Sequence, residues 1–171
     1  WEATLHPDLW TRLRKEADVV LAAPADVSLP SLDLAGRAVR ETLRLHPGSG
    51  IAPRITAVDM EIGGVHIRAG TIAAWSPYLA GRDPDVWDDP LRFDPDRFLS
   101  LDDDQRAAAD LGWVPFGRGP RSCIGFALAQ MELTLIIARM AQRLDLIATA
   151  TVVPPAEGLV VQRLPEAAVD D

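Results

Sequence analysis

The sequence predicts a mainly α-helical fold with a small antiparallel β-sheet, that is, an α+β fold. Three segments, 7–23, 31–46 and about 124–144, carry apolar residues at the spacing of an amphipathic helix. Between the second and third segments, short β-branched runs alternate with glycine turns, as in antiparallel strands. The composition is that of a globular protein, since 48% of the 171 residues are hydrophobic and 25% are charged.

The first two helices are bounded by capping and stop signals. The segment 7–23 begins at a proline and ends before Pro24. The segment 31–46 has Ser31 or Asp33 as its N-cap candidate and ends before Pro47. Both segments are therefore predicted as helices.

The middle of the chain is predicted as strands followed by an irregular segment. Gly63 and Gly64 indicate a hairpin turn, and Gly70 precedes another strand. Three prolines are expected to keep most of residues 82–113 out of regular structure, and irregular segments of this length are usually functional.

The last part is predicted as a long helix from about Ile124 to Leu144, followed by a pair of short strands within residues 149–164. No internal repeat interrupts this order of elements.

Charge and hydropathy exclude several classes of protein. The net charge is −8 and the sequence has no long block of Lys and Arg, so a nucleic acid is not an expected partner. No apolar run approaches the ~20 residues that a membrane-spanning helix needs, and no signal segment is visible. We therefore expect a cytoplasmic protein without a membrane span in this segment. The chain starts at Trp1, inside what reads as a continuing element, so we expect that its beginning is missing.

Cys123 is the only cysteine of the chain, which excludes an internal disulfide and a CxxC metal site. The histidines His6, His46 and His66 are scattered without the spacing of metal ligands. Cys123 is therefore an inert packing residue, a nucleophile, or a single ligand to a group brought from outside the chain.

The helix predicted at 31–46 places a carboxylate in its apolar face. Glu41 shares that face with Leu34, Ala38 and Leu45. A buried carboxylate is costly unless it is paired, and Arg44 lies three residues on, so a structural Glu41–Arg44 pair is predicted. The alternative is a solvated ion pair of little energetic value. Arg97, in "FDPDRF", is a further candidate partner, suited to a bidentate contact that would hold the irregular segment.

The segment "FGRGPRSCIG" is suited to a sulfur that carries negative charge. Its glycines permit a close approach of the backbone, and Pro115 and Pro120 stiffen the loop. Cys123 comes one or two residues before the predicted helix, whose unsatisfied amides and dipole favour an anion. These features argue against inert packing.

Two other interpretations of the loop fit the sequence less well. A cysteine hydrolase needs a histidine base beside the thiol, yet His46 ends a helix and His66 lies in a predicted hairpin strand. A phosphate-binding loop needs a Gly-Lys-Ser/Thr ending, which "GRGPRS" lacks. Metal ligation is the favoured interpretation.

The cysteine loop resembles that of the cytochrome P450 family of haem-thiolate monooxygenases. The family pattern Phe-x-x-Gly-x-Arg-x-Cys-x-Gly is met by Phe116, Gly119, Arg121, Cys123 and Gly125.

Two more motifs carry the same resemblance. The family's Glu-x-x-Arg helix motif is met by Glu41 and Arg44. Its third arginine motif is met by Pro95, Arg97 and Phe98, with Asp96 where glutamate is commoner. The resemblance covers residues 1–171 as a partial domain from the C-terminal part of the fold: Glu-x-x-Arg helix, sheet, meander, cysteine loop, long helix and terminal hairpin.

The resemblance implies that the cofactor is haem b (iron protoporphyrin IX), with Cys123 as its proximal thiolate and axial iron ligand. A cysteinate in this position donates electron density to the iron. Arg121 and Arg54 match family positions that pair with the haem propionates. The alternative for Arg54 is a solvated strand residue.

The remaining motif residues also take roles from the resemblance. Phe116 is expected to pack against the porphyrin, with Gly119 and Gly125 among the cofactor-binding residues. A structural role is implied for Glu41, Arg44 and Arg97.

The distal half of the family's fold is not expected in this chain. No Ala-Gly-x-x-Thr-like stretch occurs, so the N-terminal part and the distal oxygen-activating helix are expected to be absent. One hypothesis is the haem-binding C-terminal segment of a monooxygenase that inserts one oxygen atom of O2 into an apolar organic substrate and needs its missing N-terminal portion. The alternative is a truncated, catalytically inactive haem-binding or inert fragment.

Substrate and electron supply are also implied by the resemblance. Ile51, Ala52, Leu159 and Val160 match substrate-facing positions and are all apolar, which favours a lipid- or terpene-like substrate. Packing within strands explains these four residues about as well. Electrons are expected from a ferredoxin- or flavoprotein-type donor that docks on the cysteine side.

Overall fold

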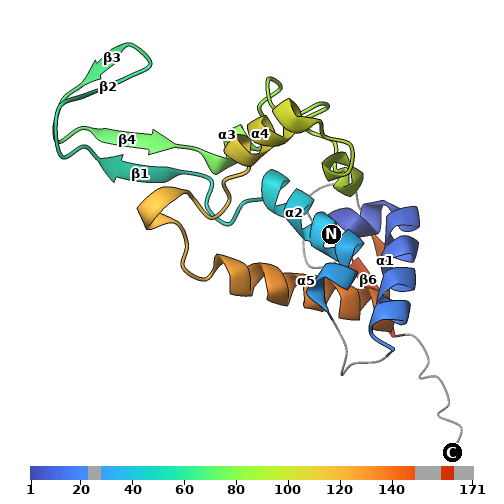
Figure 1. Ribbon diagram of the computed structural model, residues 1–171. Helices are drawn as coiled ribbons and strands as arrows, with labels where there is room; N and C mark the ends of the chain where they lie inside the picture. Colours follow the sequence, from blue (N-terminus) through green and yellow to red (C-terminus); the bar gives the residue numbers. More distant parts are fainter. Residues whose placement is uncertain (23–27, 149–158, 164–171) are drawn as a thin grey trace, which may run out of the picture. The chain divides into compact units, whose positions relative to one another are not determined.

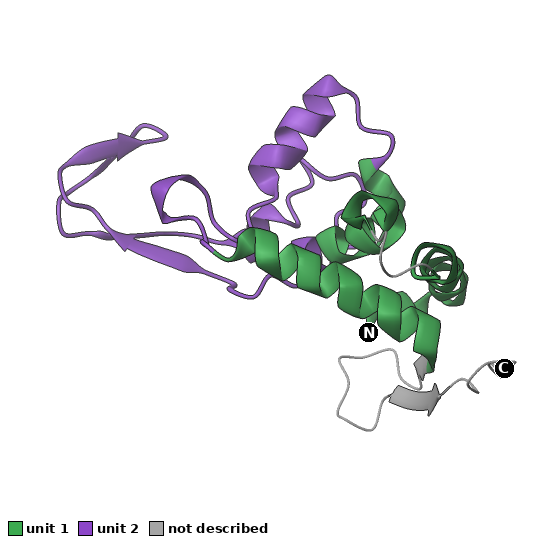
Figure 2. Ribbon diagram, turned by 60° about the horizontal axis from the view of Figure 1, so that its bottom comes forward, with its two compact units in different colours: residues 1–41, 93–98, 125–171 green, residues 42–92, 99–124 purple. Residues whose placement is uncertain are grey.

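The chain is described by a computed structural model for residues 1–22, 28–148 and 159–163 (Figure 1). Two compact units make up the chain (Figure 2). Unit 1 consists of Trp1–Glu41, Phe93–Phe98 and Gly125–Asp171, and unit 2 consists of Thr42–Arg92 and Leu99–Ile124. Helix α2 (Asp33–Leu45) therefore begins in unit 1 and ends in unit 2. The described elements confirm the predicted α+β class.

Unit 1 is built on two helices that pack against each other, α1 (Pro7–Val20) and α5 (Phe126–Arg143). The buried face of α1 consists of Leu9, Trp10, Leu13 and Ala17. The buried face of α5 consists of the small residues Thr134, Ala138 and Ala141. Small side chains on this face permit close packing of neighbouring elements. Strand β5 (Leu144–Ala148) follows α5 and pairs antiparallel with β6 (Leu159–Arg163).

The C-terminal end of α5 is held by Arg14 of α1. The Nε of Arg14 donates to the carbonyl of Ala141 at 2.9 Å, and its Nη2 donates to the carbonyl of Leu144 at 2.9 Å. The same Nη2 pairs with Asp145 Oδ1 at 3.0 Å. The last carbonyls of a helix lack partners within the helix and carry a partial negative charge. Arg14 therefore stabilises the end of α5 and the start of β5 together.

The N-terminal end of α2 is held by a carboxylate from another helix. Glu16 of α1 accepts hydrogen bonds from the backbone N–H groups of Leu34 and Ala35, at 2.7 and 2.9 Å. Two of the unsatisfied donors of the first helical turn are satisfied in this way. The expected N-cap at Ser31 or Asp33 is wrong, because Ser31 lies in a 3₁₀ turn (Leu29–Ser31) and Asp33 is the first helical residue.

Unit 2 carries two separate strand pairs, and the expected single sheet is wrong in this respect. Strand β1 (Ala52–Ile55) pairs antiparallel with β4 (Ile72–Trp75), and β2 (Met60–Ile62) pairs antiparallel with β3 (Val65–Ile67). A buried threonine, Thr56, forms hydrogen bonds with the chain between the first strand pair and the second. The hydroxyl of Thr56 donates to the carbonyl of Arg68 at 2.7 Å and accepts from the Thr71 N–H at 3.1 Å.

The hairpin turn predicted at Gly63 and Gly64 is confirmed between β2 and β3. Both glycines have positive φ, 57° and 78°. Left-handed backbone at two successive positions is the requirement of a type I′ turn, and glycine meets it without strain.

A helix occupies part of the segment that was expected to be irregular. After the short helix α3 (Pro77–Ala80), the prolines do limit regular structure, but α4 (Asp103–Gly112) follows them. Asp102 Oδ1 accepts from the Gln105 N–H at 2.8 Å, and Gln105 Oε1 accepts from the Asp102 N–H at 3.1 Å. This capping box was present in the sequence as Asp-x-x-Gln, and it starts the helix where no proline remains.

The long C-terminal helix is confirmed, with bounds within two residues of those predicted. Helix α5 ends at Arg143, and Leu144 begins strand β5, where it pairs with Arg163 of β6. The first strand of the terminal pair thus precedes the predicted range 149–164, while β6 lies within it. Residues 149–158 lie outside the described residues.

None of the described helices is both long and apolar enough to span a membrane.

The Glu16 contact generates a prediction. We expect Glu16→Gln to lower the free energy of unfolding by about 1 kcal/mol, because a neutral amide has one acceptor oxygen and no charge for the α2 amides. Urea-induced unfolding measures this change. Asp18→Asn is the matched control, since Asp18 is exposed on the same helix. Equal effects of the two substitutions would contradict the capping role of Glu16.

Candidate functional site

Glu41 is a fully buried carboxylate, with 0% of its surface exposed. Helix α2 places it on the same face as three apolar residues that are also buried, Leu34, Ala38 and Leu45. Its Oε1 accepts from Arg97 Nε at 2.8 Å and from the backbone N–H of Asp94 at 2.9 Å. A carboxylate that is removed from water requires such partners, because burying its charge alone costs several kcal/mol. The solvated alternative for Glu41 is therefore wrong.

Arg97 reaches Glu41 from a segment that is 56 residues further along the chain. The segment Phe93–Phe98 contains a 3₁₀ turn (Pro95–Phe98) and carries both donors to Glu41. A pair between Glu41 and Arg44 stays a prediction.

Arg44 is buried to the same degree, and its guanidinium donates to backbone carbonyls of unit 2. Its Nη1 donates to the carbonyls of Gly81 and, at 2.7 Å, Pro90, and its Nη2 donates to Arg92 at 3.0 Å. The indole ring of Trp87 lies 5.3 Å from the guanidinium carbon. Irregular backbone has carbonyls without strand or helix partners. Arg44 donates hydrogen bonds to three such carbonyls. One side chain thus positions a proline-containing segment.

Glycine is required at position 81 beside Arg44. A Cβ at Gly81 would lie 2.2 Å from the carbonyl oxygen of Arg44, which is closer than any real contact. The close approach of the two backbones depends on the absence of a side chain.

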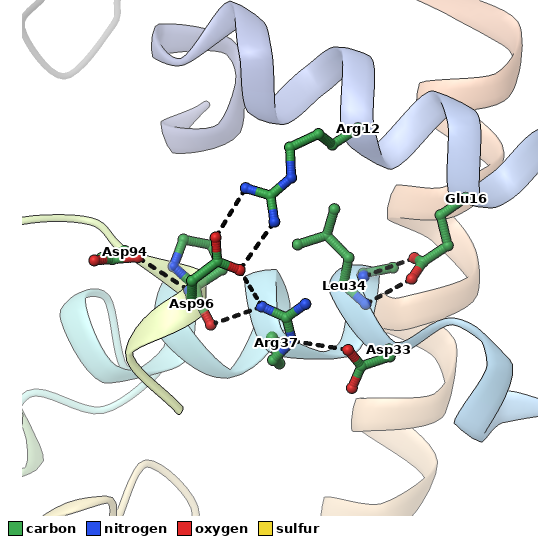
Figure 3. Close-up of polar contacts among 9 residues, drawn as sticks. Arg12, Glu16, Asp33, Leu34, Arg37, Asp94 and Asp96 are labelled. Carbon is green, nitrogen blue, oxygen red and sulfur yellow. Dashed lines mark hydrogen bonds and ion pairs between the residues drawn. The ribbon is translucent and has the colours of Figure 1, made fainter. Parts of the chain in front are cut away.

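Asp96 joins the segment Phe93–Phe98 to two helices of unit 1 (Figure 3). Arg12 of α1 contacts both carboxylate oxygens, at 2.9 and 3.0 Å, and Arg37 Nη1 of α2 pairs with Oδ1. The hydrogen bonds from Arg12 hold the pKa of Asp96 below its usual value, and the same contact raises the pKa of Arg12. Asp96 is therefore charged at neutral pH.

The cysteine loop is a series of tight turns that ends at an exposed thiol. The backbone N–H of Cys123 donates to the carbonyl of Phe116 at 2.8 Å, and the N–H of Ser122 donates to Gly119 at 3.0 Å. Gly117 and Gly119 have φ of 72° and 75°, a left-handed conformation that side chains disfavour. Cys123 is the free cysteine of the chain and is exposed.

The thiol precedes α5 by more residues than expected. The helix has Gly125 as its N-cap and Phe126 as its first residue, so Cys123 lies two residues before the cap. Among the described residues, no group of three or more His, Cys, Asp or Glu side chains is placed to hold a metal ion. A role of Cys123 as a single ligand stays a prediction.

Trp75 connects the cysteine loop with Arg54, and sequence reasoning did not single it out. Its Cζ2 lies 3.8 Å from the position that a Cβ of Gly117 would take. The Arg54 guanidinium carbon lies 4.9 Å from a Trp75 ring centroid, and Arg54 Nη1 donates to the Pro53 carbonyl. The sequence signal for Trp75 is an aromatic residue at the end of a predicted strand. In the structure, Trp75 ends β4 and pairs with Ala52 of β1. The structure therefore brings Arg54 and the loop to the same tryptophan.

The other predicted site residues have the following places. Phe116 is half-buried and meets Trp113 edge-on at 6.1 Å between ring centroids. Arg121 is exposed and ends a 3₁₀ turn (Gly119–Arg121). Ile51 is 62% exposed, and Ala52 begins β1. Leu159 and Val160 begin β6, and their side chains lie outside the described part of the structure.

Comparison with known proteins gives a family match over nearly the whole chain. The family model described as Cytochrome P450 matches residues 3–167.

Curated relatives agree with this match. The chain is 41% identical over 137 residues to a pentalenene oxygenase of Streptomyces avermitilis, which is 79% of this chain and 30% of the relative. It is 38% identical over 141 residues to a cyclooctat-9-en-7-ol 5-monooxygenase of Streptomyces melanosporofaciens, which is 81% of this chain and 30% of the relative. Cytochrome P450 3A29 of Sus scrofa is 34% identical over 145 residues, 83% of this chain and 28% of the relative. The chain thus spans less than a third of the length of these relatives.

The burial of Glu41 generates a second prediction. We expect Glu41→Ala to lower the free energy of unfolding by roughly 3–5 kcal/mol, because Arg97 would lose a buried carboxylate partner. Thermal or urea unfolding measures the loss. Asp33→Ala, which removes an exposed carboxylate from the same helix, is expected to cost no more than about 1 kcal/mol. An unchanged melting temperature for Glu41→Ala would show that the buried pair does not stabilise the chain.

Proposed function

The chain belongs to the cytochrome P450 family, and on that premise we propose that it is the haem-binding segment of a monooxygenase. In this proposal, one oxygen atom of O2 is inserted into an apolar organic substrate, with electrons from a redox partner. The observation that carries it is the lone, exposed Cys123 at the end of a loop with two left-handed glycines. Support also comes from the oxygenase names of the first two relatives.

The residues of the loop fit a haem. Cys123 is exposed rather than packed in a core, and among the described residues other than Gly119 and its two chain neighbours no atom lies within 4 Å of the place that a Cβ of Gly119 would take. An exposed arginine, Arg121, precedes the thiol by two residues, and Arg54 is also exposed. A thiolate donor with nearby open space and cationic side chains is the donor set that an iron porphyrin with two propionates requires.

Each residue of the loop takes one role in the proposal. Cys123 Sγ would bind the haem iron, and the guanidinium groups of Arg121 and Arg54 would pair with the propionates. Phe116 would pack against the macrocycle and keep water from the sulfur, while Gly119 and Gly125 would leave room for it. Bound haem would supply the activation of dioxygen, because a cysteinate ligand donates electron density to the iron.

The buried Glu41–Arg97 ion pair and the buried Arg44 have a supporting role in this proposal. Glu41 and Arg97 hold the segment Phe93–Phe98, and Arg44 holds the carbonyls of the proline-containing segment that precedes it. Both contacts give a fixed backbone to a part of the chain with little regular structure. We assign these three residues a structural role rather than contact with substrate.

A further portion of the same fold is the proposed partner of α5. The helix leaves large apolar side chains exposed: Phe126, Leu128, Met131, Leu133 and Ile136. Large apolar side chains that are exposed together on one helix are a feature of interaction sites in soluble proteins. The limited share of each relative that the chain spans supports the same idea. An N-terminal portion of the same fold, with its distal helix, would cover this surface and complete the oxygenase.

The substrate and the electron donor are proposed only by class. Relatives named for the oxygenation of pentalenene and of cyclooctat-9-en-7-ol support an apolar substrate. Ile51, Ala52, Leu159 and Val160 are the residues that we assign to face it. A ferredoxin or flavoprotein is the proposed electron donor.

The ligand assignment gives a third prediction. In the chain reconstituted with haem, we expect Cys123→Ser to abolish the red-shifted band of the reduced carbon monoxide complex, because serine does not supply a thiolate. Ser122→Ala is the matched control in the same turn and should keep the band. A Cys123→Ser protein with an unchanged band would remove Cys123 as the iron ligand.

The alternative function is a truncated haem-binding or inert fragment. Turnover assays of the chain, alone and together with an N-terminal portion of a family member, distinguish the two. Oxidation by the chain alone would contradict the dependence on a second portion. Absence of oxidation in both assays, with haem bound, would favour the inactive fragment.

A further inference from the structure

We propose that Asp96 is a positioning residue, which holds the segment Phe93–Phe98 against helices α1 and α2 and thereby keeps Arg97 in place for Glu41. Glu41 anchors this segment inside the unit through Asp94 and Arg97. Asp96 provides a second anchor, in which its partly exposed carboxylate pairs with the side chains of Arg12 and Arg37. All of these residues belong to unit 1.

Both carboxylate oxygens of Asp96 are occupied by guanidinium groups. Arg12 Nη1 donates to Oδ2 at 2.9 Å and Arg12 Nη2 donates to Oδ1 at 3.0 Å, so the contact is bidentate. Arg37 Nη1 donates to the same Oδ1. A bidentate pair fixes the orientation of both partners, which a single point contact does not do.

Arg37 is also held in position by contacts other than the one with Asp96. Its Nε pairs with Asp33 Oδ2 at 3.0 Å, one turn earlier in α2, and its Nη1 also donates to the Pro95 carbonyl at 3.3 Å. Only 13% of the Arg37 side chain is exposed. Arg37 thus contacts the segment at both a side chain and a backbone carbonyl, and its guanidinium is pre-ordered for this role.

The Asp96 network differs from an isolated ion pair at the protein surface. An isolated exposed ion pair contributes little, because solvent screens it and two long side chains lose entropy. Here one carboxylate, 39% exposed, serves two arginines from two helices, and the backbone at Asp96 is fixed by its N–H bond to Asp94 Oδ1 at 3.0 Å. Networks with bidentate geometry are the exception to the weakness of surface pairs. The arrangement in Figure 3 is of that kind.

Amide hydrogen exchange of the full chain, without added haem, tests the proposal. The Asp94 N–H reports on the segment because it donates to Glu41, and the Trp113 N–H, which donates to Ala109 in unit 2, reports on the rest. We expect Asp96→Asn to speed exchange at Asp94 by about tenfold, the effect of losing a charge-assisted contact. Exchange at Trp113 should stay at the wild-type rate.

Two variants control for charge and for packing. Asp33→Asn removes a carboxylate from the same Arg37 but not from the segment, and should speed exchange at Asp94 by less than about twofold. Asp96→Glu keeps the charge and should restore most of the protection, which a role in packing alone would not predict.

The proposal is overturned if Asp96→Asn leaves the Asp94 exchange rate unchanged, or if Asp33→Asn speeds it equally. Should Asp96→Asn unfold the chain and raise exchange at Trp113 as well, Arg12→Gln decides the matter. That variant removes only one arm of the anchor and should speed Asp94 by about threefold with Trp113 unaffected; no change at Asp94 would again reject the proposal. Because no haem is present, a failed ligand test at Cys123 leaves this result standing.

Discussion

The burial of one charge, the carboxylate of Glu41, is the constraint on which the arrangement of unit 1 depends. A carboxylate with no solvent contact must be met by a cation and by hydrogen-bond donors, or its desolvation would cost more than the helix face gains by packing. Arg97 and the Asp94 N–H meet it from a distant part of the chain. The need to satisfy Glu41 therefore determines where the segment Phe93–Phe98 lies, and Asp96 then fixes the same segment to Arg12 and Arg37 from its exposed side.

Arginine side chains satisfy backbone carbonyls that helices and strands satisfy in regular secondary structure. Arg44 satisfies three carbonyls in a segment where prolines prevent strand or helix pairing, and Arg14 satisfies the last carbonyls of α5. A guanidinium group has five donors in a rigid plane, so one side chain orients several backbone groups at once. The meander and the end of the long helix are thus held by side chains from other elements.

The cysteine loop and α5 both expose groups that folded proteins usually cover. Cys123 is exposed at the end of the loop, and α5 exposes a series of large apolar side chains. Membership of the cytochrome P450 family gives each of these features a proposed partner. A haem would cover the first, and a further part of the fold, consistent with the share of the relatives that the chain spans, would cover the second.

The sequence by itself determined the helices with their stop signals, the hairpin at Gly63 and Gly64, the buried place of Glu41 and the family motifs around Cys123, because each depends on neighbours within a few residues or on one helical period. The Asp102–Gln105 capping box of α4 is equally local. Only the tertiary structure decided that Glu16 caps α2, that Arg14 caps α5, that Arg12 reaches Asp96 and that Trp75 lies between Arg54 and the loop. These contacts join residues from different elements, and the distance between such residues is set by packing, which no local pattern encodes.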